Sequence, residues 1–586
     1  MSSTYVLVEG VNIYANVLDT NQISVIRGSS FLLKDAITTV ETELQGHLEP
    51  LSVGASSGLF RLLPDCKIND VLERIHAILT CQDKDTPFFT QSFIVEHCKA
   101  TNLPEAKEKL LGQLRLRQLL SATLVSDNPV PAQSPGPSQW HGVRPLQERA
   151  DTVTYSPPGQ PKTTHKISRS EKLRWQYGRN REREINQGYH LEEVERVCGE
   201  SPGSTCSIDN PEGYQELRAK LAEWGYCREL GHIADSRRLE EEQDDLPHPR
   251  YPKLDGKIAV FYADGNSFTK IQRDYINYAS DKDQAQQEFD RDIRGKRSQL
   301  LADLLGEMLK DDGRLPHMKT RSLHNVKEGE ESKWIKALRF ETLLWGGDEL
   351  MFVLPAWAGF EFARLFFERT ADWKIGTTPF THSAGLVFCS AKTPIRIARE
   401  LASMIADDIK ERTERNGGKR NAWDYMVLES IDYPTHRDYQ RFLEERYGVQ
   451  NKTNRPICIP GTNNVWTTRR NDMKNMLTGI LPVRQLYRLG QAITRETPDK
   501  LFHADAQKAP PEWWNIKEPA TLLEQLEQRM LQVCDKRSDL VKRCNNFANL
   551  FGIDVCNDRQ RAWLWLHLLE LREYIAPRET QGGGNA

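Results

Sequence analysis

The chain has 586 residues, of which 38% are hydrophobic and 27% are charged, and its formal net charge is −3. These values are typical of a globular protein of about three or four domains. The near balance of 79 Lys and Arg against 82 Asp and Glu excludes a uniformly basic surface for nucleic acid. No apolar run reaches the roughly 20 residues that cross a bilayer, and the N-terminus lacks the pattern of a signal peptide. We therefore expect a cytoplasmic protein with no membrane partner.

The first 126 residues alternate short apolar runs with helical patterns. The segments "TYVLVEGV" and "LSVGASSGLFRLL" predict strands. Apolar residues at helical spacing predict helices in "KINDVLERIHAIL" and "PEAKEKLLGQLRLRQLLSATLV". This order of elements is typical of an α/β domain, which we expect over residues 1–126. Residues 127–165 are rich in Pro, Ser and Gly, which predicts a linker or a long loop.

Residues 166–250 are dense in charge and predict a helical insert. The insert contains four residues that could bind one metal ion: Cys198, Cys206, Cys227 and His232. Structural zinc sites usually contain cysteines separated by two to four residues, and no pair here has that spacing. The segment is therefore compatible with a Zn²⁺ site or with buried free thiols. Its basic stretch "KLRWQYGRNRERE" (172–184) is compatible with RNA contact or with a solvated helix face whose aromatic residues turn inward.

A second α/β unit is predicted over residues 251–435. Its apolar segments "KIAVFYADGNSF" and "PFTHSAGLVF" each predict a strand, and "LLWGGDELMFVL" predicts two strands joined by a turn. Residues 436–489 form a connecting region. Residues 490–586 predict a helical C-terminal domain, because "TLLEQLEQRMLQVCDKRSDLVKRCNNFANLF" and "RAWLWLHLLELREYI" carry repeating apolar stripes.

The two α/β units share a pattern that indicates an internal duplication. The segment "VGASSGLF" (53–60) aligns without a gap on "WGGDELMF" (345–352). The turn is kept in both, but two serines of the first unit stand where the second unit has Asp348 and Glu349. The second unit is longer between its first strand and this turn. We expect the additional residues in the polar segment 311–334.

Three acidic residues fall at strand ends of the second unit. Asp264 ends "IAVFYAD", and Asp348 and Glu349 lie at the turn between two strands. If these strands are neighbours, the carboxylates converge at one end of a sheet, where their oxygen atoms suit Mg²⁺ or Mn²⁺. Two such ions about 4 Å apart activate an attacking hydroxyl and stabilise a leaving pyrophosphate. Lys410, on a predicted helix, is placed to neutralise phosphate charge.

Each of these residues also has a purely structural interpretation. Asp264 precedes Gly265, which is a common turn pair, and Asp348 with Glu349 suits a solvated hairpin tip. Lys410 suits an exposed helix position. The serines of the first unit favour the chemical interpretation, because they indicate that the fold keeps the turn without the acids.

These motifs resemble a known family. The segments "YADGNSFTKI", "WGGDELMFV", "HSAGLVF" and "DDIKERTERNGGKRN" are similar to the palm domain shared by GGDEF-type diguanylate cyclases and the large polymerase-like subunit of type III CRISPR complexes. The paired arrangement resembles the CRISPR subunit more closely, and "RGSSFLL" (27–33) resembles a stretch of its first palm. The resemblance implies an α/β chain with two α+β, ferredoxin-like palms, one of them degenerate. It also implies a zinc-containing insert and a helical C-terminal domain.

The resemblance implies an activity for the second palm. A 3′-hydroxyl of one nucleotide, with ATP expected, would attack the α-phosphate of the next and give a cyclic oligonucleotide messenger in antiviral defence. Asp264, Asp348 and Glu349 would be the catalytic residues and the ligands of Mg²⁺ or Mn²⁺. The residues expected to contact the nucleotide are Gly265, Asn266, Ser267, Phe268, Gly346, Gly347 and Lys410. RNA, other effector-complex subunits and a second copy of the chain are the expected macromolecular partners.

Departures from the family leave alternatives open. The CRISPR subunit usually has two Asp after its glycines, whereas this chain has Asp and Glu, as the cyclases do. Those cyclases carry an Asn-Asp pair where this chain has Gln272 and Arg273, which disfavours GTP and leaves ATP. The sequence contains no His-Asp dipeptide, so we expect no nuclease domain of the family's type. The alternatives are a non-catalytic or RNA-activated subunit of an RNA-guided complex, and a GTP-using cyclase.

Overall fold

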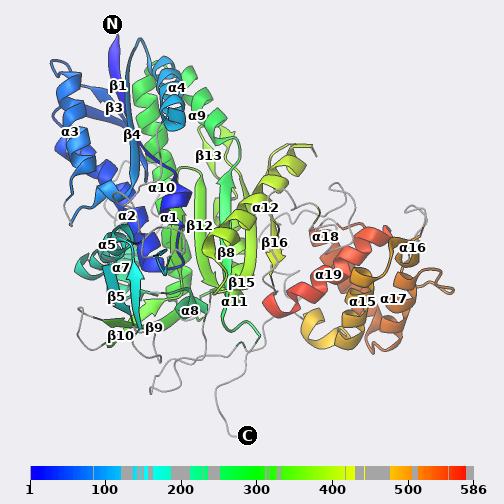
Figure 1. Cartoon of the computed structure of the whole chain (residues 1–586). Helices are drawn as coiled ribbons and strands as arrows, with labels where there is room; N and C mark the ends of the chain where they lie inside the picture. The colour runs from blue at the N-terminus through cyan, green and yellow to red at the C-terminus, as the bar shows by residue number, and fades with distance from the viewer. Residues whose placement is uncertain are drawn as a thin grey trace.

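The structure is a computed structural model of the chain (Figure 1). It describes residues 2–82, 85–120, 136–140, 146, 151–155, 163–185, 211–227, 229–234, 251, 253–310, 313–315, 317–325, 332–415, 418–428, 434, 441, 475–503, 512–551 and 553–575. None of the helices within these ranges combines the length and apolar character needed to span a bilayer. Two α/β units, an insert between them and a group of C-terminal helices make up the described part of the chain.

The first α/β unit is an antiparallel sheet with the strand order β2-β3-β1-β4. Its elements in chain order are β1 (Ser3–Val11), α1 (Ile13–Val17), α2 (Ile23–Glu43), β2 (Leu48–Val53), β3 (Ser57–Leu62), α3 (Ile68–Thr80), β4 (Ser92–Ala100) and α4 (Leu103–Leu120). Strand alternation divides β1 between two cores. Val6 and Val8 pack with α2 and α3, whereas Tyr5 and Leu7 pack with α4 on the opposite face.

The second α/β unit is a five-stranded sheet with the order β11-β12-β8-β15-β16. Its elements are β8 (Lys257–Gly265), α9 (Phe268–Tyr278), α10 (Lys282–Leu309), β11 (Glu341–Trp345), β12 (Glu349–Pro355), α11 (Ala356–Thr370), β15 (His382–Ser390), α12 (Ile395–Arg415) and β16 (Ala422–Val427). Phe261 of β8 packs against Phe366 of α11, with ring centres 4.9 Å apart. On the other face, a Cβ on Gly385 would lie 2.0 Å from the Ala402 carbonyl oxygen, so only glycine lets α12 approach β15 this closely.

The strand registers support the internal duplication that the sequence predicts. Glu9 of β1 pairs with Ser57 of β3, and Asp264 of β8 pairs with Glu349 of β12. A bulge interrupts the pairing of β2 with β3 and of β11 with β12 at corresponding positions. Each first strand is followed by a left-handed residue, Asn12 with φ 53° and Ser267 with φ 59°. These shared irregularities make chance similarity a poor explanation.

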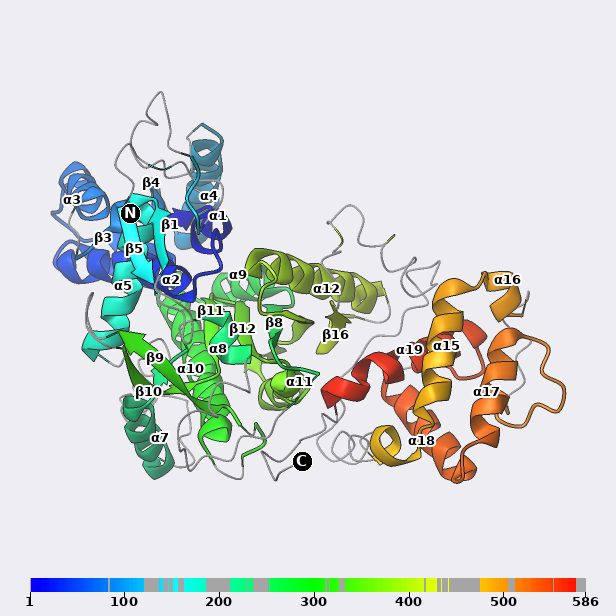
Figure 2. The ribbon, with the colours of Figure 1, turned by 60° about the horizontal axis from the view of Figure 1, so that its bottom comes forward.

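Part of the second unit's additional length forms a separate hairpin. β9 (Lys319–Asn325) pairs antiparallel with β10 (Ser332–Leu338), which also lies parallel to β7 (Gly225–Tyr226) of the insert. This hairpin overlaps the segment 311–334 in which the sequence predicts the insertion. In Figure 2 it projects toward α7 (Pro211–Glu223), away from the five-stranded sheet.

The insert packs against the first unit through α5 (Arg169–Ile185). The insert also contains α7, β7 and α8 (Leu230–Ala234). Just before it, β5 (Asp151–Tyr155) and β6 (Thr163–Ile167) pair antiparallel at the end of the segment 127–165, in which the sequence predicts a linker or a long loop. A Cβ on Gly28 of α2 would lie 1.9 Å from the Arg174 carbonyl oxygen, so the two helices approach closely. The buried Arg174 side chain pairs with Asp19 at 2.9 Å. Arg174 of the basic stretch therefore faces the first unit, and RNA contact by the rest of the stretch stays a prediction.

A buried ion pair joins the two units. Arg27, in the "RGSSFLL" segment of α2, donates from Nε to Oε1 of Glu341 on β11 at 3.2 Å. The two side chains are only 2% and 4% exposed. At the corresponding position of the first unit, Glu49 pairs with Arg61 near the surface. Because a buried charge is stable only with its partner, the Arg27 pair fixes how the two units sit together.

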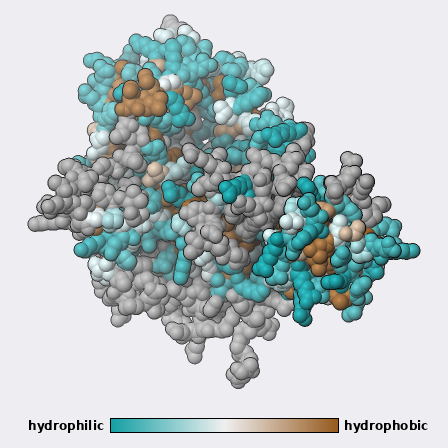
Figure 3. Space-filling view, turned by 45° about the vertical axis from the view of Figure 1, so that its right-hand side comes forward, coloured by the Kyte–Doolittle hydropathy of each residue, from teal (hydrophilic) through white to brown (hydrophobic). Residues whose placement is uncertain are grey.

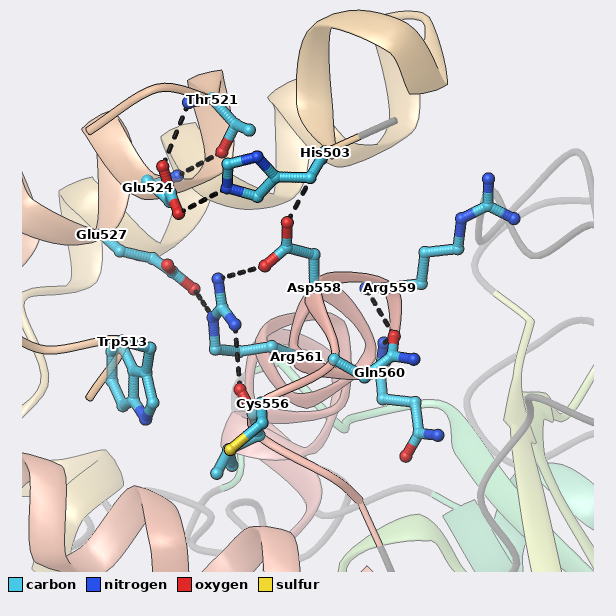
Figure 4. Close-up of polar contacts among 12 residues, drawn as sticks. His503, Trp513, Thr521, Glu524, Glu527, Cys556, Asp558, Arg559, Gln560 and Arg561 are labelled. Atoms are coloured by element: carbon cyan, nitrogen blue, oxygen red, sulfur yellow. Dashed lines mark hydrogen bonds and ion pairs between the residues drawn. The ribbon is translucent and has the colours of Figure 1, made fainter. Parts of the chain in front are cut away.

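The C-terminal helices form a third body beside the second unit (Figures 1 and 2). They are α15 (Val483–Arg495), α16 (Pro498–Leu501), α17 (Leu522–Gln532), α18 (Arg537–Phe551) and α19 (Asp558–Ile575). Figure 4 shows the buried Arg561 of α19 between Glu527 and Asp558, at 2.8 and 2.7 Å. The Tyr425 hydroxyl of β16 contacts the His567 ring at 2.5 Å, which attaches α19 to the edge of the five-stranded sheet.

Candidate active site

One end of the five-stranded sheet brings the three predicted acidic residues together. Asp264 is the direct partner of Glu349 across the strand pair, and Ser383 of β15 lies on its other side. Asp348 precedes β12 in the turn, and its carbonyl oxygen accepts a hydrogen bond from the Gly265 amide at 3.1 Å. All three acidic side chains are partly buried. This end of the sheet is therefore a concentrated negative site.

Close packing explains Gly265, and backbone hydrogen bonds hold the turn at Gly346. A Cβ on Gly265 would lie 2.7 Å from the Phe380 ring and 2.8 Å from the Asp348 Cβ. The Gly346 amide donates to the Glu349 carbonyl oxygen at 2.9 Å. Arg297 of α10 donates to the Gly346 carbonyl oxygen and holds the turn from outside the sheet. These protein contacts hold the turn in place without a ligand.

The concentration of negative charge changes the titration of the aspartates. Burial, together with the charges of Asp264 and Glu349, raises the pKa of Asp348 to about 7. Burial also raises the pKa of Asp264, and a hydrogen bond from the Lys410 ammonium group opposes that rise. Lys410 reaches the site from α12, as the sequence predicts. Since a neighbouring cation favours a charged carboxylate, a bound cation would relieve the repulsion at Asp348.

Glu349 has a different environment from the two aspartates. The Tyr14 hydroxyl donates to its Oε2 at 2.9 Å, and the Tyr262 hydroxyl donates to its Oε1 at 3.0 Å. Burial and the charge of Glu349 raise the pKa of both tyrosines, so both hydroxyls remain protonated donors. The Arg399 guanidinium carbon lies 3.4 Å from the centre of the Tyr14 ring. Because Tyr14 belongs to α1, the first unit contributes a side chain to this site.

The residues that follow Asp264 make structural contacts. The Asn266 amide donates to the Thr381 carbonyl oxygen at 2.7 Å, and its side chain donates to Thr381 Oγ1 at 3.0 Å. Ser267 provides the left-handed turn before α9. A Cβ on Gly347 would lie 3.3 Å from the Phe268 ring, so these two residues pack together. Nucleotide contact by these residues stays a prediction.

The donor set suits a cation held by two protein carboxylates. Within the described ranges, no group of three His, Cys, Asp or Glu side chains has the geometry of a metal site. Asp264 and Asp348 nevertheless fit Mg²⁺, which commonly binds one or two carboxylates together with waters and substrate phosphates. Metal binding by Glu349 stays a prediction, because both of its oxygens accept phenolic hydrogen bonds.

Two of the four predicted zinc ligands, Cys227 and His232, lie within the described residues. Cys198 and Cys206 lie outside the described residues. Cys227 is buried and forms no disulfide, and His232 is buried on α8.

Several residues of the site were absent from the sequence prediction. Tyr262 lies two residues before Asp264, and strand alternation, which puts both on one face, is the signal that could have identified it. Tyr14, Arg297 and Arg399 carry no such signal, because their contacts with the site depend on how helices pack.

No protein-family model and no curated protein matches the chain. Its structure is similar to that of Csm1. For Csm1 in T. onnurineus, the identity is 13% and the TM-score is 0.43, over 98% of this chain and 70% of that one. A Csm1-Csm4 cassette in complex with cA4 gives 12% and 0.42, again over 98% and 70%. The Csm1-Csm4 subcomplex of the type III-A CRISPR-Csm interference complex gives 13% and 0.36, over 90% and 69%. At this level the likeness concerns the fold alone.

Proposed function

We propose that the second α/β unit is a metal-dependent nucleotidyltransferase. It joins nucleoside triphosphates, with ATP as the expected substrate. The 3′-hydroxyl of one nucleotide attacks the α-phosphate of the next, and pyrophosphate is released. The product is a cyclic nucleotide or oligonucleotide signal. This proposal accounts for three carboxylates and an ammonium group at the open end of a sheet whose strands are otherwise apolar.

The comparison of the two turns is the observation that carries the proposal. Both turns close with the same hydrogen bonds: Gly54 to Ser57 at 2.8 Å and Gly346 to Glu349 at 2.9 Å. The first unit builds this turn with serines, so the backbone does not require acidic side chains. Burying Asp348 beside two other carboxylates opposes folding above the ordinary pKa of an aspartate, because burial and then the charges of Asp264 and Glu349 raise its pKa to about 7. A cost of this kind is typical of a functional site.

The protein groups have separate roles in the proposed reaction. Asp264 and Asp348 would hold Mg²⁺ or Mn²⁺, which when bound activates the attacking hydroxyl and stabilises the pyrophosphate. Lys410 lies beside Asp264 and is placed to exchange that contact for a nucleotide phosphate oxygen. Arg297 keeps the turn, and with it Asp348, in place. No protein nucleophile is required.

Incubation with labelled nucleotides tests this function. The purified full chain is mixed with each labelled NTP and Mg²⁺ or Mn²⁺, with and without RNA, and the products are separated. We expect a product from ATP that contains 3′-linked phosphates and that disappears in Asp348→Asn. The control Asp274→Asn removes an exposed carboxylate that pairs with Lys270 and should change nothing. A product from GTP in place of ATP would indicate the cyclase-like alternative, and no product under any condition would refute the enzyme.

A second candidate is a subunit of an RNA-guided complex. Csm1 is described in a complex with Csm4, and a similar arrangement for this chain is a proposal. Four leucines of α4 favour it, since they are 52–86% exposed: Leu111, Leu116, Leu119 and Leu120. Figure 3 shows hydrophobic side chains at the surface in the upper part of the molecule, where the first unit lies. Exposed apolar groups of this kind commonly mark contacts with other proteins. Copurification of RNA and a second protein would support this role.

A further inference from the structure

The first unit reaches the acidic site through α1. The Tyr14 hydroxyl spans the boundary between the units and donates to Glu349 at 2.9 Å, while Tyr262 of the second unit donates to the other oxygen of the same carboxylate. The bond joins residues that are 335 positions apart in the chain. Glu349 therefore accepts one hydrogen bond from each unit.

The position of Tyr14 is fixed from several sides. Arg399 of α12 stacks on its ring at 3.4 Å. The left-handed residue Asn12 starts α1, and the buried Arg174 of the insert donates to the Asn16 carbonyl oxygen near its end. A helix of five residues is not stable by itself, so these contacts set its place. A shift of the first unit or the insert must therefore move the Tyr14 hydroxyl relative to Glu349.

The two aspartates differ from Glu349 in what they contact. Asp264 contacts the Lys410 ammonium group, which a bound metal cation could replace as the partner of this carboxylate. Both oxygens of Glu349 instead accept hydrogen bonds from neutral phenols, one from the buried Tyr262 and one from Tyr14, which is 36% exposed. Hydrogen bonds to a carboxylate are among the stronger ones, so a metal ion would have to displace or share them.

We propose that Glu349 is a positioning residue that latches the two α/β units together through Tyr14, and that it is not a metal ligand. Metal binding then falls to Asp264 and Asp348. The position of the first unit is transmitted to the acidic turn through the Tyr14 contact. The assignment of the metal ligands rests on the proposed function, whereas the latch does not.

Two measurements on the full chain separate these parts. Binding of Mn²⁺ alone, followed by electron paramagnetic resonance, reports the ligands. We expect Asp264→Asn and Asp348→Asn to weaken binding by at least about tenfold, and Glu349→Ser to stay within about threefold of the unchanged chain. The first unit carries serine at the corresponding position and forms the same turn, so this substitution is compatible with the backbone. Equal loss in Glu349→Ser and Asp348→Asn would overturn the assignment.

Hydrogen–deuterium exchange reports the latch without any metal. We expect Tyr14→Phe and Glu349→Ser each to speed exchange of the α1 amides and of the 346–349 turn. The double variant should show no further increase, because the two residues act as one contact. The control Tyr278→Phe alters a tyrosine that is 91% exposed and should leave both segments unchanged.

The outcomes separate failure of the latch from failure of the function. Unchanged exchange of α1 in Glu349→Ser would refute the latch whatever the chain catalyses. Absence of Mn²⁺ binding in the unchanged chain would refute the ligand assignment and count against the proposed function, while the exchange result would still stand.

Discussion

The two α/β units place the same turn in two chemical settings. In each, a glycine near the end of the first strand donates to the carbonyl oxygen of the residue just before the strand that pairs with it, Gly10 to Ser56 at 2.7 Å and Gly265 to Asp348 at 3.1 Å. One turn then presents hydroxyl groups and the other presents carboxylates. The backbone geometry is therefore a property of the fold, and the acids are an addition to it. The difference separates what the sheet needs from what the proposed reaction needs.

The largest expected effect comes from the acid at the end of the first strand. Glu9 and Asp264 occupy corresponding positions, and burial raises the pKa of both. Asp264→Asn should lower the rate of product formation by at least about a thousandfold, because it removes a carboxylate from the reacting site. Glu9→Gln should leave the rate unchanged. Equal loss in both variants, measured as initial rates with labelled ATP, would show that the first unit is not degenerate.

Loss of the buried ion pair between Arg27 and Glu341 should have the largest effect on stability. Arg27→Met removes the guanidinium group that pairs with the buried Glu341, which costs about 3–5 kcal/mol of unfolding free energy. At the corresponding pair near the surface, Glu49→Gln removes the carboxylate while Arg61 keeps its second partner, Asp283, so the cost is about 0–1 kcal/mol. Urea denaturation followed by circular dichroism measures both. Similar losses in the two variants would mean that burial of the Arg27 pair is unimportant.

Alanine substitutions at the corresponding glycines, Gly265 and Gly10, should differ less in their cost to the free energy of unfolding. A Cβ on Gly265 would meet the Phe380 ring at 2.7 Å and the Asp348 Cβ at 2.8 Å, whereas a Cβ on Gly10 would chiefly meet the end of the flexible Leu33 side chain at 2.7 Å. We expect Gly265→Ala to cost about 1–3 kcal/mol and Gly10→Ala to cost less, by thermal unfolding. Gly265→Ala should also displace Asp348 and lower activity. Equal costs would indicate that the turn of the second unit is no more closely packed than the first.

The pH dependence of stability should show the smallest effect. The pKa of Asp348 is raised from 3.8 to about 7, so the folded state binds a proton that the unfolded state has lost between these values. Its contribution to stability is present below pH 3.8 and is lost as the pH rises through 7. Asp348→Asn should remove about 1–2 kcal/mol of this loss, after allowance for solvent screening. If Asp348→Asn leaves the slope of unfolding free energy against pH unaltered between pH 5 and about 8, the raised pKa of Asp348 is contradicted.

The sequence was sufficient to predict the local features of the site. Strand alternation and turn glycines are local signals, so the duplication and the meeting of Asp264 with Asp348 and Glu349 could be anticipated. The contact of Tyr14 with Glu349 could not, because it depends on the packing of one unit against the other. The hairpin of β9 and β10 was expected only as an insertion, since its polar composition gives no clear strand signal.

The central claim is that the second sheet folds without the acids of its turn, whereas the proposed reaction requires them. The direct test replaces Asp348 and Glu349 together by serine, the residues that the first unit carries at the same positions. Unfolding free energy and ATP-dependent product are then measured on one preparation at pH 8. We predict a variant within about 2 kcal/mol of the unchanged chain, with no detectable product. A variant that fails to fold, or one that still forms product, would contradict the claim.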